Sequence, residues 1–165
     1  MALDPIRTVR GALAGGVAAA VWLAQQPLDQ RVFGCDHDDA TLLARLLGRP
    51  RSTGVWLHVQ NGAVFGALYA AAAPSLPVPP PLRGPLAGLA EHAATWPFTA
   101  LLAPRLWGNP RALAQATWRH LLFGAVLGEL ERRLNPSDDR PRPVDEAAVA
   151  SNGHGSAEHL VASGR

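Results

Sequence analysis

The chain is short and poor in charge, which limits the classes of protein it can belong to. Its 165 residues fit one domain. Charged residues make up only 17% of the chain and hydrophobic residues 48%, whereas an ordinary soluble domain has about 25% charged residues. All fifteen basic residues are arginines, scattered among thirteen acids, so no basic stripe points to DNA or RNA. The single cysteine, Cys35, excludes an intrachain disulfide and a cysteine-based zinc site.

The first hydrophobic run covers residues 8–28 and carries no charge between positions 11 and 24. Its length of about 20 residues predicts a helix that crosses a bilayer, and Arg10 at its edge can reach the headgroups. A signal peptide is the alternative, because a basic start precedes the run and Ala18 and Ala20 offer a small-x-small cleavage site.

A polar link at residues 29–54 follows and contains one short amphipathic helix. Asp38 or Asp39 can cap this helix, the leucines of residues 42–47 form its apolar face, and Gly48 ends it. We expect it to lie at the membrane interface or, equally, to be an ordinary surface helix.

Three further hydrophobic runs occupy residues 55–73, 84–102 and 113–131. Six prolines within residues 74–85 predict an extended connector, and Pro97 should kink or break the helix that contains it. The four long runs and the short amphipathic helix together predict an all-α fold, a four-helix transmembrane bundle.

The composition changes near the end of the chain. From residue 135 onward Pro, Ser, Asp, Arg and Gly dominate without apolar periodicity, so this part cannot bury enough apolar surface to fold. We therefore assign residues 1–134 to the transmembrane helical domain and residues 135–165 to a disordered polar tail.

One phrase occurs twice, at residues 56–68 and 118–130. Both copies fit W-x-H-x-x-x-G-A-V-x-G-x-L, with seven of thirteen positions identical, and a weaker match relates residues 11–15 to 84–88. The bundle is thus expected to consist of two similar two-helix units, related as parallel repeats are. Glycines four residues apart, which allow close helix packing, recur in all four long helices: Gly11, Gly15, Gly62, Gly66, Gly84, Gly88, Gly124 and Gly128. We expect the second and fourth long helices to lie near a pseudo-twofold axis with their glycines turned inward.

The Gly/Ala-rich helices, the H-x-x-x-G-A-V-x-G phrase at residues 120–128 and the proline-rich centre resemble the YagU-like small bacterial inner-membrane proteins. The similarity covers residues 8–133 and rests on the spacing of glycines and histidines. It implies a multi-pass membrane protein without an assigned activity, and it supplies no catalytic residues.

His58 and His120 occupy matching positions in the two copies of the phrase. If the pseudo-twofold axis holds, they would face each other, and two histidines on facing helices can hold a haem or a metal. We favour the alternative that each histidine bonds a neighbouring helix or lies at the level of the headgroups.

Glu91 and His92 lie inside the third long run. Ionisable groups inside a membrane are costly and usually face the protein interior, a cavity or a proton path. Glu91 falls at helical spacing from Gly84 and Gly88, which places it on the packing face. A proton relay or a substrate contact is one interpretation, and a structural hydrogen bond that orients the helix is the favoured one.

Two further polar features are weaker. Arg119 and Glu129 lie ten residues apart, about 15 Å along a helix axis, so they cannot pair, and a solvated or snorkelled charge is expected for both. The stretch Cys35–Asp39 contains residue types that bind metals, but adjacent side chains point in different directions. A polar turn that caps the next helix is the expected role.

These observations favour a structural or interaction component of the bacterial cytoplasmic membrane, in contact with lipid and with a second copy or another membrane protein. A small transporter or proton-linked component using Glu91 and His92 is the first alternative, and a haem protein using His58 and His120 is the second. A soluble helical bundle stays as an outside alternative. No enzyme activity, metal or nucleic-acid partner is predicted. Seven arginines on one side and six on the other do not decide the orientation, but those nearest the membrane at both termini favour cytoplasmic ends.

Overall fold

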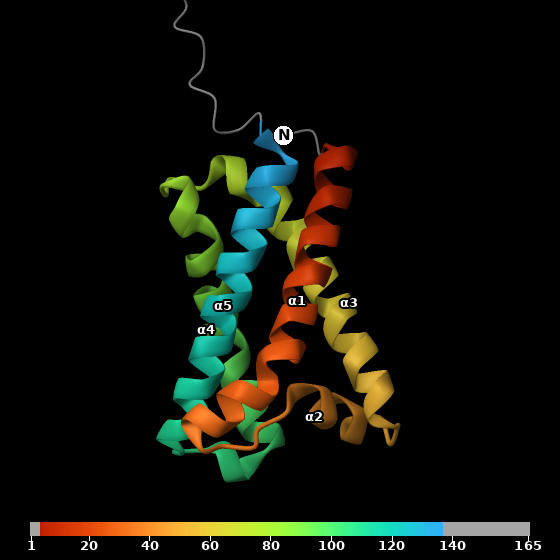
Figure 1. The fold of residues 1–165 in the computed structure, drawn as a ribbon, viewed down its shortest axis with the longest axis vertical. Coiled ribbons are helices and arrows are strands. Elements are labelled where there is room, and N and C mark those ends of the chain that lie inside the picture. Colours follow the sequence, from red (N-terminus) through yellow and green to blue (C-terminus); the bar gives the residue numbers. More distant parts are fainter. Residues whose placement is uncertain (1–3, 137–165) are drawn as a thin grey trace, which may run out of the picture.

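The computed structural model describes residues 4–136, and all its regular elements are helices, with no strand in that part of the chain (Figure 1). The expected all-α fold is therefore confirmed. The elements in order are α1 (Pro5–Phe33), α2 (Asp39–Leu46), α3 (Arg51–Ala72), η1 (Ala73–Ser75), α4 (Pro80–Leu102), η2 (Pro104–Leu106) and α5 (Pro110–Leu134). Nearly all of the expected polar tail, residues 137–165, lies outside the described residues.

The first helix is longer at both ends than the hydrophobic run predicts. Asp4 caps it by accepting from the backbone N–H groups of its first turn, and Pro5 stands at the first helical position, where a missing N–H costs nothing. At the other end the helix continues through Pro27 and stops at Gly34, whose φ of +60° suits glycine. In the polar end of this helix, the Asp29 side chain binds Gln115 and Arg119 of α5.

The proline-rich segments are more helical than expected. α4 begins at Pro80 because two consecutive prolines occupy its first turn, where the N–H groups have no partner within the helix. The extended connector is correspondingly shorter than residues 74–85. α4 also runs through Pro85 and Pro97 to Leu102, so the helix is not broken at Pro97.

Glycines bring the long helices together in two pairs. In the α1–α3 pair, a β-carbon on Gly15 would overlap the carbonyl oxygen of Gly62, and one on Gly66 would overlap that of Gly11. In the α4–α5 pair, a β-carbon on Gly84 would overlap the carbonyl oxygen of Gly124, and the remaining glycines of both helices, Gly88 and Gly128, also meet the partner backbone. Only glycine permits backbones to approach this closely.

The second and fourth long helices, α3 and α5, do not pack as closely on each other as expected, although the rings of Phe65 and Phe123 lie 5.7 Å apart between them. The helices that pack closely are α1 with α3, α4 with α5, and α1 with α5, while α2 packs on α3. Each glycine stripe finds a complementary stripe on the helix of its own pair, which leaves α1 and α5 to form the seam between the pairs. The first turn of α1 and the last turn of α5 lie at the same end of the bundle (Figure 1).

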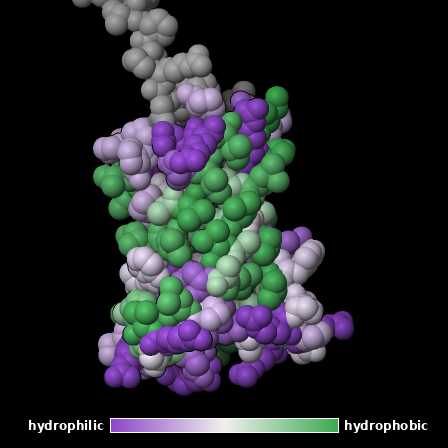
Figure 2. Space-filling view, in the orientation of Figure 1, coloured by the Kyte–Doolittle hydropathy of each residue, from purple (hydrophilic) through white to green (hydrophobic). Residues whose placement is uncertain are grey.

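Large apolar side chains lie both inside the bundle and on its surface. The interior combines small residues such as Ala14 and Ala18 with the buried ion pair of Arg119 and Asp29 and with a cluster of larger apolar side chains, Trp22, Tyr69, Phe123 and Leu127. Large apolar side chains point outward from every long helix. On the face drawn in Figure 2, the middle is mostly apolar and the two ends are polar. By length and hydropathy, α1 is the single described helix that could cross a membrane on its own.

Candidate functional site

A buried ion pair lies at the end of the bundle near α2. The Arg119 guanidinium, on α5, donates from Nε to Oδ2 of Asp29 at 2.6 Å and from Nη2 to Oδ1 at 2.7 Å. Both side chains are almost fully buried, at 0% and 1% exposed. Two parallel hydrogen bonds of this kind combine charge attraction with a defined orientation. The pair therefore fixes the last turns of α1 against the middle of α5.

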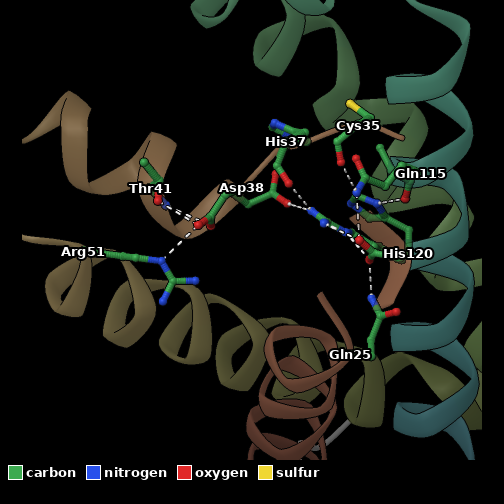
Figure 3. Close-up of polar contacts among 12 residues, drawn as sticks. Gln25, Cys35, His37, Asp38, Thr41, Arg51, Gln115 and His120 are labelled. Atoms are coloured by element: carbon green, nitrogen blue, oxygen red, sulfur yellow. Dashed lines mark hydrogen bonds and ion pairs between the residues drawn. The ribbon is translucent and has the colours of Figure 1, made fainter. Parts of the chain in front are cut away.

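The remaining hydrogen-bonding capacity of this ion pair is taken up by neighbours. Gln115 donates to Oδ1 of Asp29 at 2.7 Å and to the carbonyl of Cys35 at 3.0 Å, while Gln25 donates to Oδ2 of Asp29 at 2.6 Å. Figure 3 shows these groups converging from α1, α5 and the link that follows α1. Such full pairing is what a buried charge requires in a medium of low dielectric constant.

The third nitrogen of Arg119 binds the link before α2. Nη1 donates to the carbonyl of His37 at 3.0 Å and to Oδ2 of Asp39 at 3.2 Å, and the other Asp39 oxygen lies 2.9 Å from Nε2 of His37. Burial alone would raise the pKa of Asp39, but the hydrogen bond from His37 and the charge of Arg119 hold that pKa well below its usual range. Asp39 is thus a carboxylate that anchors α2 to α5.

Asp38 provides the expected helix cap. Its carboxylate accepts from the backbone N–H of Thr41 at 3.1 Å, from the Thr41 hydroxyl at 2.7 Å and from Nε of Arg51 at 3.0 Å (Figure 3). Burial opposes the charge, but these three hydrogen bonds outweigh it and lower the pKa of Asp38 to about 2. The interpretation of Cys35–Asp39 as a capping turn is confirmed at Asp38.

The two histidines of the repeated phrase contact the same tryptophan. The Trp22 ring lies with its centroid 5.0 Å from that of His58 and 4.7 Å from that of His120, both in edge-on arrangements. A haem held by both histidines would therefore have to displace Trp22, which is itself buried. The Nδ1–H of His120 donates to the carbonyl of Ala116 at 2.8 Å, so Nε2 is left as the acceptor of this ring.

His92 extends this aromatic group towards α4. Its centroid lies 4.7 Å from that of His120, and its Nε2 lies 3.0 Å from the Thr117 hydroxyl. Because that hydroxyl donates to the carbonyl of Leu113, it accepts from Nε2–H of His92. His92 is thus buried and makes the structural hydrogen bond, to a neighbouring helix, that is the favoured interpretation from the sequence. Its Nδ1 stays without a partner within the described residues.

A cavity of about 240 Å³ adjoins this histidine group and is covered by α2. Its polar wall contains Asp39, Glu91, His58 and His120, and the polar residues Asn61 and Thr95 in its lining are exposed. The rest of the wall is apolar and includes aromatic rings and leucines: Trp22, Phe98, Phe123, Leu42, Leu43 and Leu46. Cavities with an apolar wall and a few convergent polar groups are the usual form of small-molecule sites.

A larger hollow of about 560 Å³ lies between α2 and η2 and shares Leu42, Leu46 and Leu102 with the wall of the first cavity. Its lining mixes acidic and basic side chains, among them Asp38 and Arg105, and Asp38 is already hydrogen-bonded to Thr41 and Arg51. The smaller cavity has the better-defined chemistry because one of its two carboxyl groups is not committed to another residue within the described part of the chain.

Glu91 is that carboxyl group. It points to the cavity from α4, is partly buried, and forms no hydrogen bond or ion pair within the part of the chain that the structure describes. His92, its neighbour in sequence, lies on the α5 side and does not pair with it. Glu91 and His92 therefore belong to two adjoining environments rather than to one relay.

The structure corrects one expectation about charge and supports another. Arg119 is not solvated or snorkelled but fully buried, because the end of α1 and the link before α2 cover it. Glu129 is exposed and pairs with Arg132 and Arg133 on its own helix. Asp29 was not predicted as a site residue from the sequence. The available signal was a lone acidic residue next to a hydrophobic run, which an arginine from another run could pair with.

No protein-family model, no curated protein and no solved structure matches this chain. The resemblance to the YagU-like proteins accordingly stays a prediction, and the functional argument rests on the geometry of the chain itself.

Proposed function

We propose that the protein is a multi-pass integral membrane protein whose four long helices cross a lipid bilayer. The observation that carries the proposal is the outward orientation of large apolar side chains on all four long helices. Leu13 on α1, Val64 on α3 and Leu86 on α4 are 63%, 61% and 48% exposed. Soluble monomers rarely expose continuous apolar surface of this kind, whereas lipid covers it at no cost.

The dimensions of the helices support the same placement. α3, α4 and α5 contain 22, 23 and 25 residues, which corresponds to roughly 33–38 Å at 1.5 Å per residue. The hydrocarbon core of a bilayer is about 30 Å thick. Glycine-mediated contacts and a buried, fully paired charge are also the packing devices of membrane bundles.

The low hydropathy of α5 has a physical explanation in this proposal. This helix includes Arg119, which is neutralised by Asp29 inside the bundle. Arg119 lowers the mean hydropathy of the helix without facing lipid. The exposed residues alone decide how a helix interacts with a bilayer.

A second function, binding or transport of a small molecule, is favoured by one specific observation. The uncommitted carboxyl group of Glu91 lies in the wall of a cavity inside the proposed membrane domain. An ionisable group in this position usually marks a substrate or ion site. The alternative is a purely structural or interaction role, in which a second copy or another membrane protein binds the apolar surface. That role does not use the cavity.

Membrane fractionation tests the first proposal. The full chain is expressed in bacteria, and the membranes are washed with alkaline carbonate. We expect the protein to stay in the membrane pellet and to need detergent for extraction. Recovery in the carbonate supernatant, or purification as a detergent-free monomer, would contradict the proposal.

A further inference from the structure

The wall of the cavity beneath α2 contains two carboxyl groups, those of Asp39 and Glu91. Asp39 is already paired with His37 and Arg119. Glu91 has no base assigned to it within residues 4–136. A cationic ligand would complete the pairing, because a buried carboxylate without a counter-charge is costly.

The hydrogen-bonding groups of the wall favour a cation that carries N–H donors. The Nε2 atom of His120 is an acceptor, since Nδ1–H is committed to the carbonyl of Ala116. His58, in the same wall, has an Nε2 atom that is buried and unpartnered. Unsatisfied buried nitrogens need an explanation such as a missing ligand. An ammonium group with three donors could serve Glu91 and a histidine acceptor together.

The apolar part of the wall favours a ligand that carries an apolar group in addition to its ammonium group. The rings of Trp22, Phe98 and Phe123 line the cavity, and aromatic rings attract organic cations and pack against their apolar parts. Within the described residues no three His, Cys, Asp or Glu side chains converge as metal ligands. The wall is therefore better suited to an amine than to a metal ion.

We propose that the cavity between α2, α3 and α4 binds a protonated primary amine, with the Glu91 carboxylate as its counter-ion and an apolar group of the ligand against Trp22 and Phe98. The lining includes residues of α3 and α4, which do not pack closely on each other, and among these residues Asn61 and Thr95 are exposed. This inference deepens the second function proposed above. The amine can come from a free molecule or from the headgroup of phosphatidylethanolamine.

Equilibrium binding of radiolabelled 2-phenylethylammonium to the full chain in phosphatidylcholine nanodiscs tests the inference. We expect saturable binding that phenylacetate, the anion of similar shape, does not displace. Glu91→Gln should weaken binding at least tenfold, while Glu129→Gln, which changes an exposed carboxyl group, should leave it unchanged. Equal displacement by the anion, or unchanged binding by Glu91→Gln, would overturn the site.

A chemical variant keeps the test valid if Glu91→Gln does not fold. Glu91→Cys in a Cys35→Ser background is alkylated in one preparation with iodoacetate, which restores a carboxylate, and with iodoacetamide, which leaves a neutral amide. We expect binding after the first treatment only, and equal binding after both would contradict the role of the charge. Nanodiscs containing phosphatidylethanolamine identify the source, because a headgroup ligand competes with the soluble amine.

The carbonate wash separates this inference from the proposal on which it rests. Protein that stays in the washed membrane but does not bind the amine counts against the cavity site alone. Protein that leaves with the carbonate counts against the membrane location.

Discussion

Arg119 on α5 and Asp29 on α1 form a two-point ion pair, 90 residues apart in the sequence, with N–O distances of 2.6 and 2.7 Å. The pair lies on the seam between the two glycine-packed helix pairs. It therefore fixes how the α1–α3 pair sits against the α4–α5 pair at the end of the bundle that contains the cavity.

Removing one member of this pair should destabilise the bundle strongly. We expect Asp29→Asn to lower the free energy of unfolding by about 3–5 kcal/mol, because Arg119 would keep a buried charge without its main partner. Thermal unfolding in detergent measures the effect. Glu129→Gln serves as the control, since it changes only exposed pairs with Arg132 and Arg133, and it should leave the midpoint nearly unchanged. Equal midpoints for both variants would show that the buried pair does not hold the helices.

The glycine contacts predict that neighbouring positions of α5 differ in their tolerance of a large side chain. We expect Gly124→Leu to prevent α4 from approaching α5, because even a β-carbon at this position would overlap the backbone of Gly84. Overpacking of this kind costs at least about 1–3 kcal/mol. Ala125→Leu, at the adjacent exposed position, should be tolerated. Size-exclusion chromatography and thermal unfolding in detergent compare the two, and a tolerated Gly124→Leu would refute the packing.

The α2 cap predicts an acid-dependent loss of stability. The pKa of Asp38 is about 2 in the folded chain, whereas an aspartate in an unfolded chain has a pKa near 4. Its stabilising effect is thus complete above about pH 4 and is lost as the pH falls towards 2. We expect the thermal midpoint of the natural protein to fall more steeply over this range than that of Asp38→Asn. Asp36→Asn, an exposed neighbour, should follow the natural protein. Parallel curves for the natural protein and Asp38→Asn would contradict the role of the cap.

Local signals predicted most of the helices. Asp38 as a cap and Gly48 as a stop are read from residue types at fixed positions, and both occur in the structure. The prediction of an extended connector was wrong at residues 80–85, where α4 has already begun. Prolines disfavour the interior of a helix, but they are tolerated in its first turn. The glycine positions were informative about close approach, but spacing alone cannot tell which helix supplies the other stripe.

The candidate site depended on long-range contacts that no local pattern specifies. In the sequence, Arg119 is an isolated charge within α5. In the folded chain, Asp29, Gln115 and the link before α2 surround it. His58 and His120 stood out through the repeat, but their shared contact with Trp22 requires α1 to lie between α3 and α5. Only the assembled helices show which charges are paired and that, among residues 4–136, Glu91 has no partner.

Lipid contact at the outward side chains of all four long helices tests the account most directly. Single spin labels are placed by Leu13→Cys, Val64→Cys, Leu86→Cys and Leu121→Cys in a Cys35→Ser background, with Arg49→Cys in the exposed α2–α3 link as the reference. In proteoliposomes we expect the four labels to collide more with oxygen, which concentrates in the bilayer, than with a polar nickel chelate, and the reference label to show the reverse. Preferential collision of the four labels with the nickel chelate would contradict the membrane-spanning bundle.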